Sequence, residues 1–284
     1  MTSRRAGNEV IVPQRPAWAP DSVDIERPSV ARMYDYFLGG SHNFAADRQL
    51  AEQALCVFPD APYVVRANRA FLYRAVQHLC AAGINQFLDL GSGIPTAGNV
   101  HEIVLAANPE AHTVYVDADP VAVAHAGALL ANVTQVDVLH ADLRDPGEVL
   151  KQAVAVGIDL ARPLAVLLVS VLPFIPDEDD PAAIIAAYRE ASAPGSHLAI
   201  SHGTNDYQPE TVGKVEGIYE NTTQPGVFRS RTQIEQLMRG YELVPPGLVD
   251  AIHWRPTLDE EIPDPLGGDV ARYSLYAAVG HEPR

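Results

Sequence analysis

The sequence is poor in cysteine, which limits the chemistry it can carry. Only Cys56 and Cys80 occur among its 284 residues, far apart and without the two-residue spacing of a redox or metal-binding pair. A scaffold held together by disulfides is therefore excluded. Because both cysteines fall in apolar helical patterns, we expect two buried thiols in the reducing environment of the cytoplasm.

Positive charge is also scarce. Lys and Arg number 20 against 36 Asp and Glu, which gives a formal net charge of −16. Such a chain repels phosphate backbones, so we expect no nucleic-acid partner. No apolar run approaches the roughly 20 residues that span a bilayer, and the first residues lack the apolar stretch of a secretory signal. No set of His, Cys and carboxylate residues has convincing ligand spacing, so we expect neither a membrane association nor a metal.

The chain divides into three parts. Residues 1–26 are polar and rich in proline, and we expect them to be flexible. Residues 27–61 hold two helical patterns, 29–38 and 44–57, which we interpret as a helical lid segment. Residues 62–284 form the predicted main domain.

Strand-like and helical runs alternate through the main domain. The strand-like runs cover residues 86–90, 113–117, 136–140, 164–170, 197–201, 241–249 and 273–279. The helical runs cover residues 62–82, 97–107, 120–130, 146–156, 181–192 and 232–239, whereas 203–229 looks irregular. Continuous apolar strands that alternate with helices predict a parallel sheet covered on both faces. The predicted fold is α/β and Rossmann-like: a doubly wound, mostly parallel seven-stranded sheet with an antiparallel C-terminal hairpin and an N-terminal helical extension.

The strand ends carry the predicted site, because ligands of open α/β sheets bind beyond the carboxyl ends of the strands. The first strand ends in the turn Asp89-Leu90-Gly91-Ser92-Gly93, where glycine lets the backbone approach a ligand closely. The second strand ends on Asp117, whose two oxygens suit a ribose diol. The third is followed by Asp142 and Leu143, which suit an adenine edge, and the fourth ends on Ser170. Together these features predict a nucleoside site.

Charge narrows the choice of nucleoside ligand. A dinucleotide fold requires a third glycine, but Ile94, Pro95 and Thr96 follow Gly93, and Asp89 would repel a pyrophosphate. S-adenosylmethionine carries a sulfonium and an ammonium but no phosphate, so it suits an acidic turn. An NAD-dependent oxidoreductase stays as an alternative.

At these motifs the sequence resembles the class I S-adenosylmethionine-dependent methyltransferases. The shared motifs are D-L-G-S-G (89–93), V-Y-V-D (114–117) and H-A-D-L (140–143). A narrower resemblance is to an actinobacterial methyltransferase family formerly catalogued as a domain of unknown function. It is carried by R-P-S-V-A-R-M-Y-D-Y-F-L-G-G-S-H-N-F (27–44), R-A-N-R-A-F-L-Y-R-A-V (66–76) and D-L-G-S-G-I-P-T (89–96).

The resemblance implies a set of cofactor contacts. Gly91, Ser92 and Gly93 would line the methionine moiety, supported by Asp89, and Asp117 would take the ribose hydroxyls. Arg66 or Arg69, on the helix with Asn68, would pair with the methionine carboxylate. The remaining implied contacts are Ala118 on the adenine face, Asp142 and Leu143 on its edge, and Ser170 below the sulfonium.

Two further predictions concern the lid and the catalytic group. Tyr36 and Gly39 would contact the cofactor from the lid, although they suit an ordinary helix and its cap equally well. Methyl transfer requires mainly an in-line arrangement in a dry pocket, so no dedicated catalytic residue is necessary. His202, which ends the fifth strand, is a candidate general base, with a structural histidine as the alternative.

The acceptor is left open by the sequence. Enzymes that methylate nucleic-acid bases carry Asp or Asn, two prolines and an aromatic residue after the fourth strand, whereas this chain has Ser170-Val171-Leu172-Pro173-Phe174. We therefore expect a small-molecule acceptor, with methylation of a hydroxyl or carboxyl oxygen favoured. A non-catalytic protein that binds S-adenosylmethionine or S-adenosylhomocysteine is the alternative, and the oligomeric state stays open.

Overall fold

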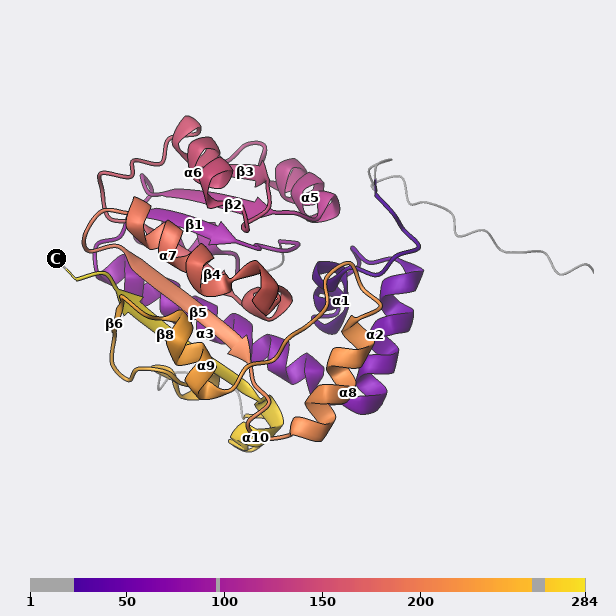
Figure 1. Ribbon diagram of the computed structural model, residues 1–284. Coiled ribbons are helices and arrows are strands. Elements are labelled where there is room, and N and C mark those ends of the chain that lie inside the picture. The colour runs from indigo at the N-terminus through magenta and orange to yellow at the C-terminus, as the bar shows by residue number, and fades with distance from the viewer. Residues whose placement is uncertain (1–22, 96–97, 257–263, 284) are drawn as a thin grey trace, which may run out of the picture.

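The computed structural model describes residues 23–95, 98–256 and 264–283, so most of the expected flexible segment 1–26 lies outside it. Its strands form one sheet in the order β3-β2-β1-β4-β5-β8-β6, with β7 also paired to β8 (Figure 1). The strands are Gln86–Leu90 (β1), His112–Asp117 (β2), Val136–His140 (β3), Ala165–Val169 (β4), His197–Gly203 (β5), Glu242–Leu243 (β6), Val249–Asp250 (β7) and Leu275–His281 (β8). The first five strands are parallel and β8 is antiparallel to its neighbours, which confirms the predicted architecture.

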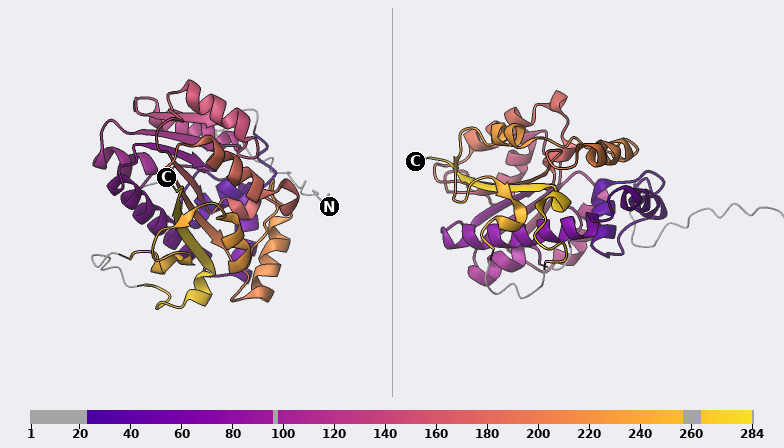
Figure 2. Two further views of the ribbon diagram at one scale, coloured as in Figure 1. Left: turned by 60° about the vertical axis from the view of Figure 1, so that its left-hand side comes forward. Right: turned by 90° about the horizontal axis from the view of Figure 1, so that it is seen from below.

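Helices cover both faces of the sheet (Figures 1 and 2). They are Val30–Phe37 (α1), Ala45–Val57 (α2), Ala61–Ala81 (α3), Val100–Ala107 (α4), Pro120–Leu130 (α5), Pro146–Ala155 (α6), Pro181–Ala191 (α7), Pro209–Tyr219 (α8), Arg231–Leu237 (α9) and Val270–Tyr273 (α10). Side chains of a strand alternate between the two faces. Leu88 therefore lies in the core formed with α6, α7 and α9, whereas Phe87 lies in the core formed with α3, α4 and α5.

The N-terminal helices α1 and α2 lie beside α8 at the carboxyl end of the parallel strands (Figure 1). Met33 and Phe37 of α1 share an apolar cluster with α2, α3 and Tyr219 of α8. Below this cluster the buried Arg32 binds Asp47, with 2.9 Å from Nε to Oδ2, and Asp119, with 3.2 Å from Nη1 to Oδ2. These two ion pairs connect α1 to α2 and to the loop after β2. Loss of either carboxylate would leave the buried charge of Arg32 only partly compensated, which is strongly unfavourable.

Four sequence predictions need correction. Residues 203–229 are not irregular throughout, because α8 forms there despite two glycines that lower its helix propensity. The expected strand 241–249 is two short strands, β6 and β7, separated by a segment whose Pro245 and Pro246 lack backbone N–H donors. The thiols are not both buried either: Cys56 is exposed and Cys80 is half-buried. The helix expected from residue 97 begins at Val100, and residue 97 itself lies outside the described part.

The sheet reverses its strand order beside β1. Strands β2 and β3 lie on one side of β1, and β4 and β5 lie on the other. Ligand crevices of open α/β sheets form at such a reversal, outside the carboxyl ends of the strands. The acidic turn after β1 therefore stands where this fold places a ligand.

Candidate functional site

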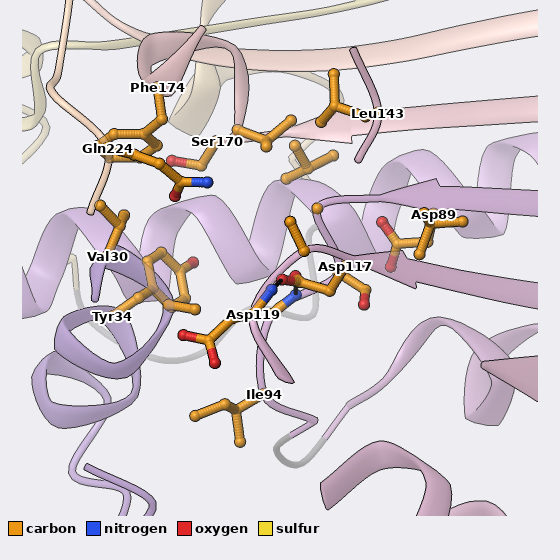
Figure 3. Close-up of a pocket in the computed structure, with 18 of the residues that line it drawn as sticks. Val30, Tyr34, Asp89, Ile94, Asp117, Asp119, Leu143, Ser170, Phe174 and Gln224 are labelled. Atoms are coloured by element: carbon orange, nitrogen blue, oxygen red, sulfur yellow. Dashed lines mark hydrogen bonds between the residues drawn. The ribbon is translucent and has the colours of Figure 1, made fainter. Parts of the chain in front are cut away.

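A cavity lies between α1 and the carboxyl ends of β1, β2 and β4 (Figure 3). It measures about 1120 Å³, including the space that opens to solvent. The structure brings most of the predicted cofactor residues to its wall: Asn68, Asp89, Gly91, Ser92, Gly93, Asp117, Ala118, Asp142, Leu143 and Ser170. Figure 3 shows Val30 and Tyr34 of α1 facing this row of strand ends.

The turn after β1 is fixed by the neighbouring strand. The amides of Gly91 and Ser92 both donate to the carbonyl of Val116, at 2.8 and 3.1 Å. Gly91 has a φ of 72°, and a Cβ atom there would lie 2.3 Å from the Val171 side chain. Only glycine fits this position, because it combines a left-handed backbone with a close approach to a neighbour.

Asp117 is held by backbone donors. Its Oδ2 accepts from the Gly93 amide at 2.7 Å and its Oδ1 from the Asp119 amide at 2.8 Å. Burial raises the pKa of Asp117 to about 6, although these hydrogen bonds favour the ionised form. Each carboxylate oxygen keeps further lone-pair capacity, so Asp117 can still accept from hydroxyl groups of a ligand.

Asp89 carries the most perturbed carboxyl group of the cavity. Burial raises its pKa to about 7; the charge of Arg69 opposes this rise and the charge of Asp117 adds to it. Arg69 of α3 also lines the cavity and donates from Nη2 to the carbonyl of Gly98 at 2.7 Å. A bound cation would stabilise the ionised form of Asp89.

Asp142 is more constrained than the sequence suggests. Arg144 donates to it from Nε at 3.0 Å and from Nη2 at 2.5 Å, and these bonds lower the pKa of Asp142. Arg144 also binds Asp179, with 2.9 Å from Nη1 to Oδ2. The carboxylate is therefore already ionised and oriented, with only part of its accepting capacity left for a ligand.

One of the acids that line the cavity, Asp35, has a buried carboxylate oxygen without a partner in the described part of the chain. Asp35 of α1 is 2% exposed; its Oδ2 accepts from the His42 amide at 2.9 Å and from Asn43 Nδ2 at 2.8 Å. Its Oδ1 has no hydrogen-bond partner among the described residues. A buried acceptor of this kind is costly. The oxygen packs against Gly40, where a Cβ atom would lie 2.0 Å from it. The sequence pointed to a lid around residue 35, but no local signal singled out this oxygen.

Comparison with known proteins identifies the family. Residues 16–283 match the family described as S-adenosyl methyltransferase. A DUF574 family protein from Streptomyces avermitilis is 36% identical, with a TM-score of 0.86, over 92% of this chain and 99% of that one. A Thermobifida fusca protein classed provisionally as a methyltransferase is 39% identical, with a TM-score of 0.87, over 95% of this chain and all of that one. No curated protein matches the chain at a significant level.

The chain belongs to the S-adenosyl methyltransferase family. This confirms the resemblance found in the sequence, and it identifies the chain as a methyltransferase whose cofactor is S-adenosylmethionine. The cavity fits that cofactor in charge. Among the described residues, five acidic ones line it (Asp35, Asp89, Asp117, Asp119 and Asp142) against two basic ones (Arg69 and Arg144). A sulfonium and an ammonium suit such a lining, whereas a pyrophosphate would be repelled.

Three of the predicted cofactor residues of this methyltransferase do not line the cavity. Arg66 is exposed, and its guanidinium lies 5.4 Å from the centre of the Tyr63 ring, so Arg69 is the arginine that α3 turns toward the site. The Tyr36 hydroxyl donates instead to Glu52 of α2. Gly39 is exposed just beyond the end of α1 and has a φ of 82°. This left-handed conformation is typical of a glycine that caps a helix, which was the alternative to a cofactor contact.

The geometry also speaks against His202 as a general base. The ring is fully buried, Nδ1 lies 2.6 Å from the carbonyl of Gly203, and Nε2 lies 3.0 Å from Nη1 of Arg229. Because Arg229 can only donate, Nε2 must be the accepting nitrogen, and both ring positions are used. Burial lowers the pKa of His202 to about 3, so it is a neutral structural residue.

Two structural findings concern the described ranges of the chain. No group of three or more His, Cys, Asp and Glu residues gathers in a way that could hold a metal ion there. Within the same ranges, none of the helices combines the length and apolar character needed to cross a membrane.

Proposed function

We propose that this methyltransferase transfers the methyl group of S-adenosylmethionine to an oxygen of a small molecule, with the cofactor held in the cavity at the strand ends. The observation that carries this proposal is the charge of the lining: acidic side chains from three strand ends and α1 surround the cavity. This arrangement suits a cation and disfavours nucleotides with phosphates.

The nucleoside half of the cofactor is assigned to the second and third strands. Asp117, fixed by two backbone amides, accepts from the ribose hydroxyls. Ala118 packs on the adenine face, while Asp142 and Leu143 meet its edge. The order of strands β1, β2 and β3 across the sheet supports this assignment.

The methionine half is assigned to the first strand and the helices that face it. Gly91, Ser92 and Gly93 give the close backbone approach, and Arg69 pairs with the carboxylate. Asp89 accepts from the ammonium group. Charge-assisted hydrogen bonds of this kind are stronger than neutral ones.

The chain's own part in the chemistry is positioning. When bound, the cofactor supplies a methyl carbon attached to a positively charged sulfur. Helix α1 forms one wall of the cavity. Closure of this helix over a bound cofactor would exclude water and strengthen the polar contacts inside. Ser170, in a left-handed conformation with a φ of 59°, stands at the end of β4 where the acceptor must approach. Holding the acceptor oxygen in line with the methyl group is the main contribution to rate.

Isothermal titration calorimetry tests the cofactor assignment. We expect S-adenosylmethionine to bind with a Kd in the micromolar range, about −8 kcal/mol. Asp117→Ala should weaken binding by about 10- to 100-fold, since it removes charge-assisted bonds of about 1.5–3 kcal/mol. Glu110→Ala, an exposed acid outside the cavity, is the control and should leave affinity unchanged. Binding of NADH in place of S-adenosylmethionine would overturn the proposal.

A further inference from the structure

A second cavity adjoins the cofactor cavity. It measures about 860 Å³, including the space that opens to solvent, and lies among α1, α2, α8, the turn after β4 and the end of β5. Val30, Tyr34, Ser170 and Phe174 line both cavities, so they form a shared wall. We call this second space the apolar chamber.

The chamber lining has no charged side chain among the described residues. Its lining includes the aromatic rings of Tyr34, Phe37, Phe58, Phe174, Tyr219, Phe228 and Tyr273. The remaining polar groups on its wall are hydroxyls, such as those of Ser170 and Thr211. This contrasts with the acidic cofactor cavity on the other side of the shared wall.

Tyr219 offers a polar contact in this apolar surrounding. Its ring meets that of Phe174 edge to face, with centroids 5.4 Å apart. Its hydroxyl forms no hydrogen bond within the described part of the chain, and burial raises its pKa to about 12. It therefore stays neutral at physiological pH and can donate to, or accept from, an uncharged ligand group.

We infer that the apolar chamber binds the methyl acceptor, and that this acceptor is an uncharged, largely apolar molecule that presents a hydroxyl group at the shared wall. The inference rests on the proposed function. An ionised carboxylate or ammonium would lose its hydration in the chamber without gaining a counter-charge, which is strongly unfavourable. The structure thus narrows the favoured acceptors from hydroxyl or carboxyl oxygens to hydroxyl oxygens.

The transfer balances for such an acceptor. The hydroxyl oxygen bonds to the methyl carbon as the carbon–sulfur bond breaks, and the electron pair of that bond stays on sulfur. The hydroxyl proton passes to water. Among the described residues no His, Asp or Glu lines the chamber, so an acidic hydroxyl such as a phenol fits best.

Three probes of one shape test the charge preference. We would titrate 2-naphthol, 2-naphthoate and 2-naphthylmethylamine into the full chain saturated with S-adenosylhomocysteine, using calorimetry at about pH 7.5. The neutral naphthol should bind at least about tenfold more tightly than either charged probe. A charged probe that binds as tightly as naphthol, or no naphthol binding to a protein that does bind S-adenosylhomocysteine, would overturn the inference. Failure of S-adenosylhomocysteine itself to bind would instead count against the proposed function.

A charge placed in the chamber should reverse the preference. Thr211→Asp puts a carboxylate on the chamber wall; it should weaken naphthol by at least about tenfold and tighten the ammonium probe. Gly213→Asp is the matched control, since it makes the same charge change on α8 in open space outside the lining. Binding of S-adenosylhomocysteine to both variants shows that each is folded. Equal effects of the two variants on the probes would contradict the assignment of the chamber.

Discussion

The cofactor cavity and the apolar chamber share a wall but differ in the origin of their linings. The cofactor cavity is built largely from the ends of successive strands, where Asp89, Asp117 and Asp142 follow apolar runs. The apolar chamber is built from α1, α2, α8 and segments near residues 174, 203, 228 and 274, which are far apart in the sequence. The lining of the cofactor cavity is therefore determined by the sheet, whereas the lining of the apolar chamber is determined by the helices and loops that pack against the edge of the sheet.

The difference in charge between the two linings matches the tasks that we propose for them. The cofactor carries fixed charges, so its cavity can select it by electrostatics. An acceptor in the chamber meets only rings, aliphatic groups and hydroxyls among the described residues, so it is selected by shape and by the absence of charge. If this division is right, single changes should damage one region and leave the other intact.

The largest effect is expected from Gly91→Ala. A Cβ atom at this position would lie 2.3 Å from Val171, on a backbone with a φ of 72°. The left-handed conformation costs a non-glycine residue about 1–2 kcal/mol, and overpacking adds about 1–3 kcal/mol. We therefore expect calorimetry to show cofactor affinity reduced by at least about 100-fold.

Two further variants separate the collision from the backbone strain. Gly83→Ala introduces a side chain at a φ of 88° with nothing within 4 Å, so it should leave cofactor binding unchanged. Adding Val171→Ala to Gly91→Ala removes the colliding side chain and should restore part of the affinity. No restoration would mean that the turn is damaged by strain alone.

A smaller effect, confined to the apolar chamber, is expected from Gly203→Ala. The added Cβ would lie 2.3 Å from the ring of Phe228, which must then move within the chamber wall. We expect naphthol to bind about tenfold more weakly, with cofactor affinity unchanged. Gly217→Ala, on α8 with open space around it, serves as the control. A loss of cofactor affinity in Gly203→Ala would show that the two regions are not separable.

The sequence predicted the cofactor cavity better than the chamber for a physical reason. A strand end places its next residues at a known edge of the sheet, so Asp89, Gly91 and Asp117 could be placed together from local patterns alone. The chamber depends on α8, which the sequence did not predict because Gly213 and Gly217 lower the helix propensity of this segment. Its rings come together only through tertiary packing, which local patterns do not encode.

Site residues on the helices α1 and α3 were predicted less accurately than those at the strand ends, but better than those of the chamber. The pattern around residues 66–69 indicated an arginine at the site, but only the packing of α3 shows that Arg69 lines the cavity while Arg66 is exposed. On α1 the sequence favoured Tyr36, whereas the cavity is lined by Tyr34 and Asp35. Adjacent residues of a helix point to different sides of it. To predict which of them lines the cavity, one must know which face of the helix packs against the edge of the sheet.

The smallest predicted effect is a pH dependence that belongs to the cofactor cavity alone. Burial raises the pKa of Asp117 to about 6 and that of Asp89 to about 7. Between about pH 4 and about pH 7 the folded protein without cofactor therefore holds protons that the unfolded chain has lost, so its free energy of unfolding falls as pH rises. A bound cation favours the ionised carboxylates, so the two protons are released on binding.

Cofactor affinity should accordingly rise severalfold from about pH 5.5 to about pH 7.5, as Asp117 and Asp89 ionise in turn. Calorimetry in buffers of different ionisation enthalpy would count the protons released. Asp89→Asn should flatten the upper part of this dependence, because it removes the group with the higher pKa. Naphthol affinity at saturating S-adenosylhomocysteine should change little over the same range, since the chamber lining has no carboxylate among the described residues. An equal pH dependence of naphthol affinity would mean that the carboxylates at the strand ends also interact with the acceptor. It would contradict our proposal that only the cofactor cavity selects its ligand by charge.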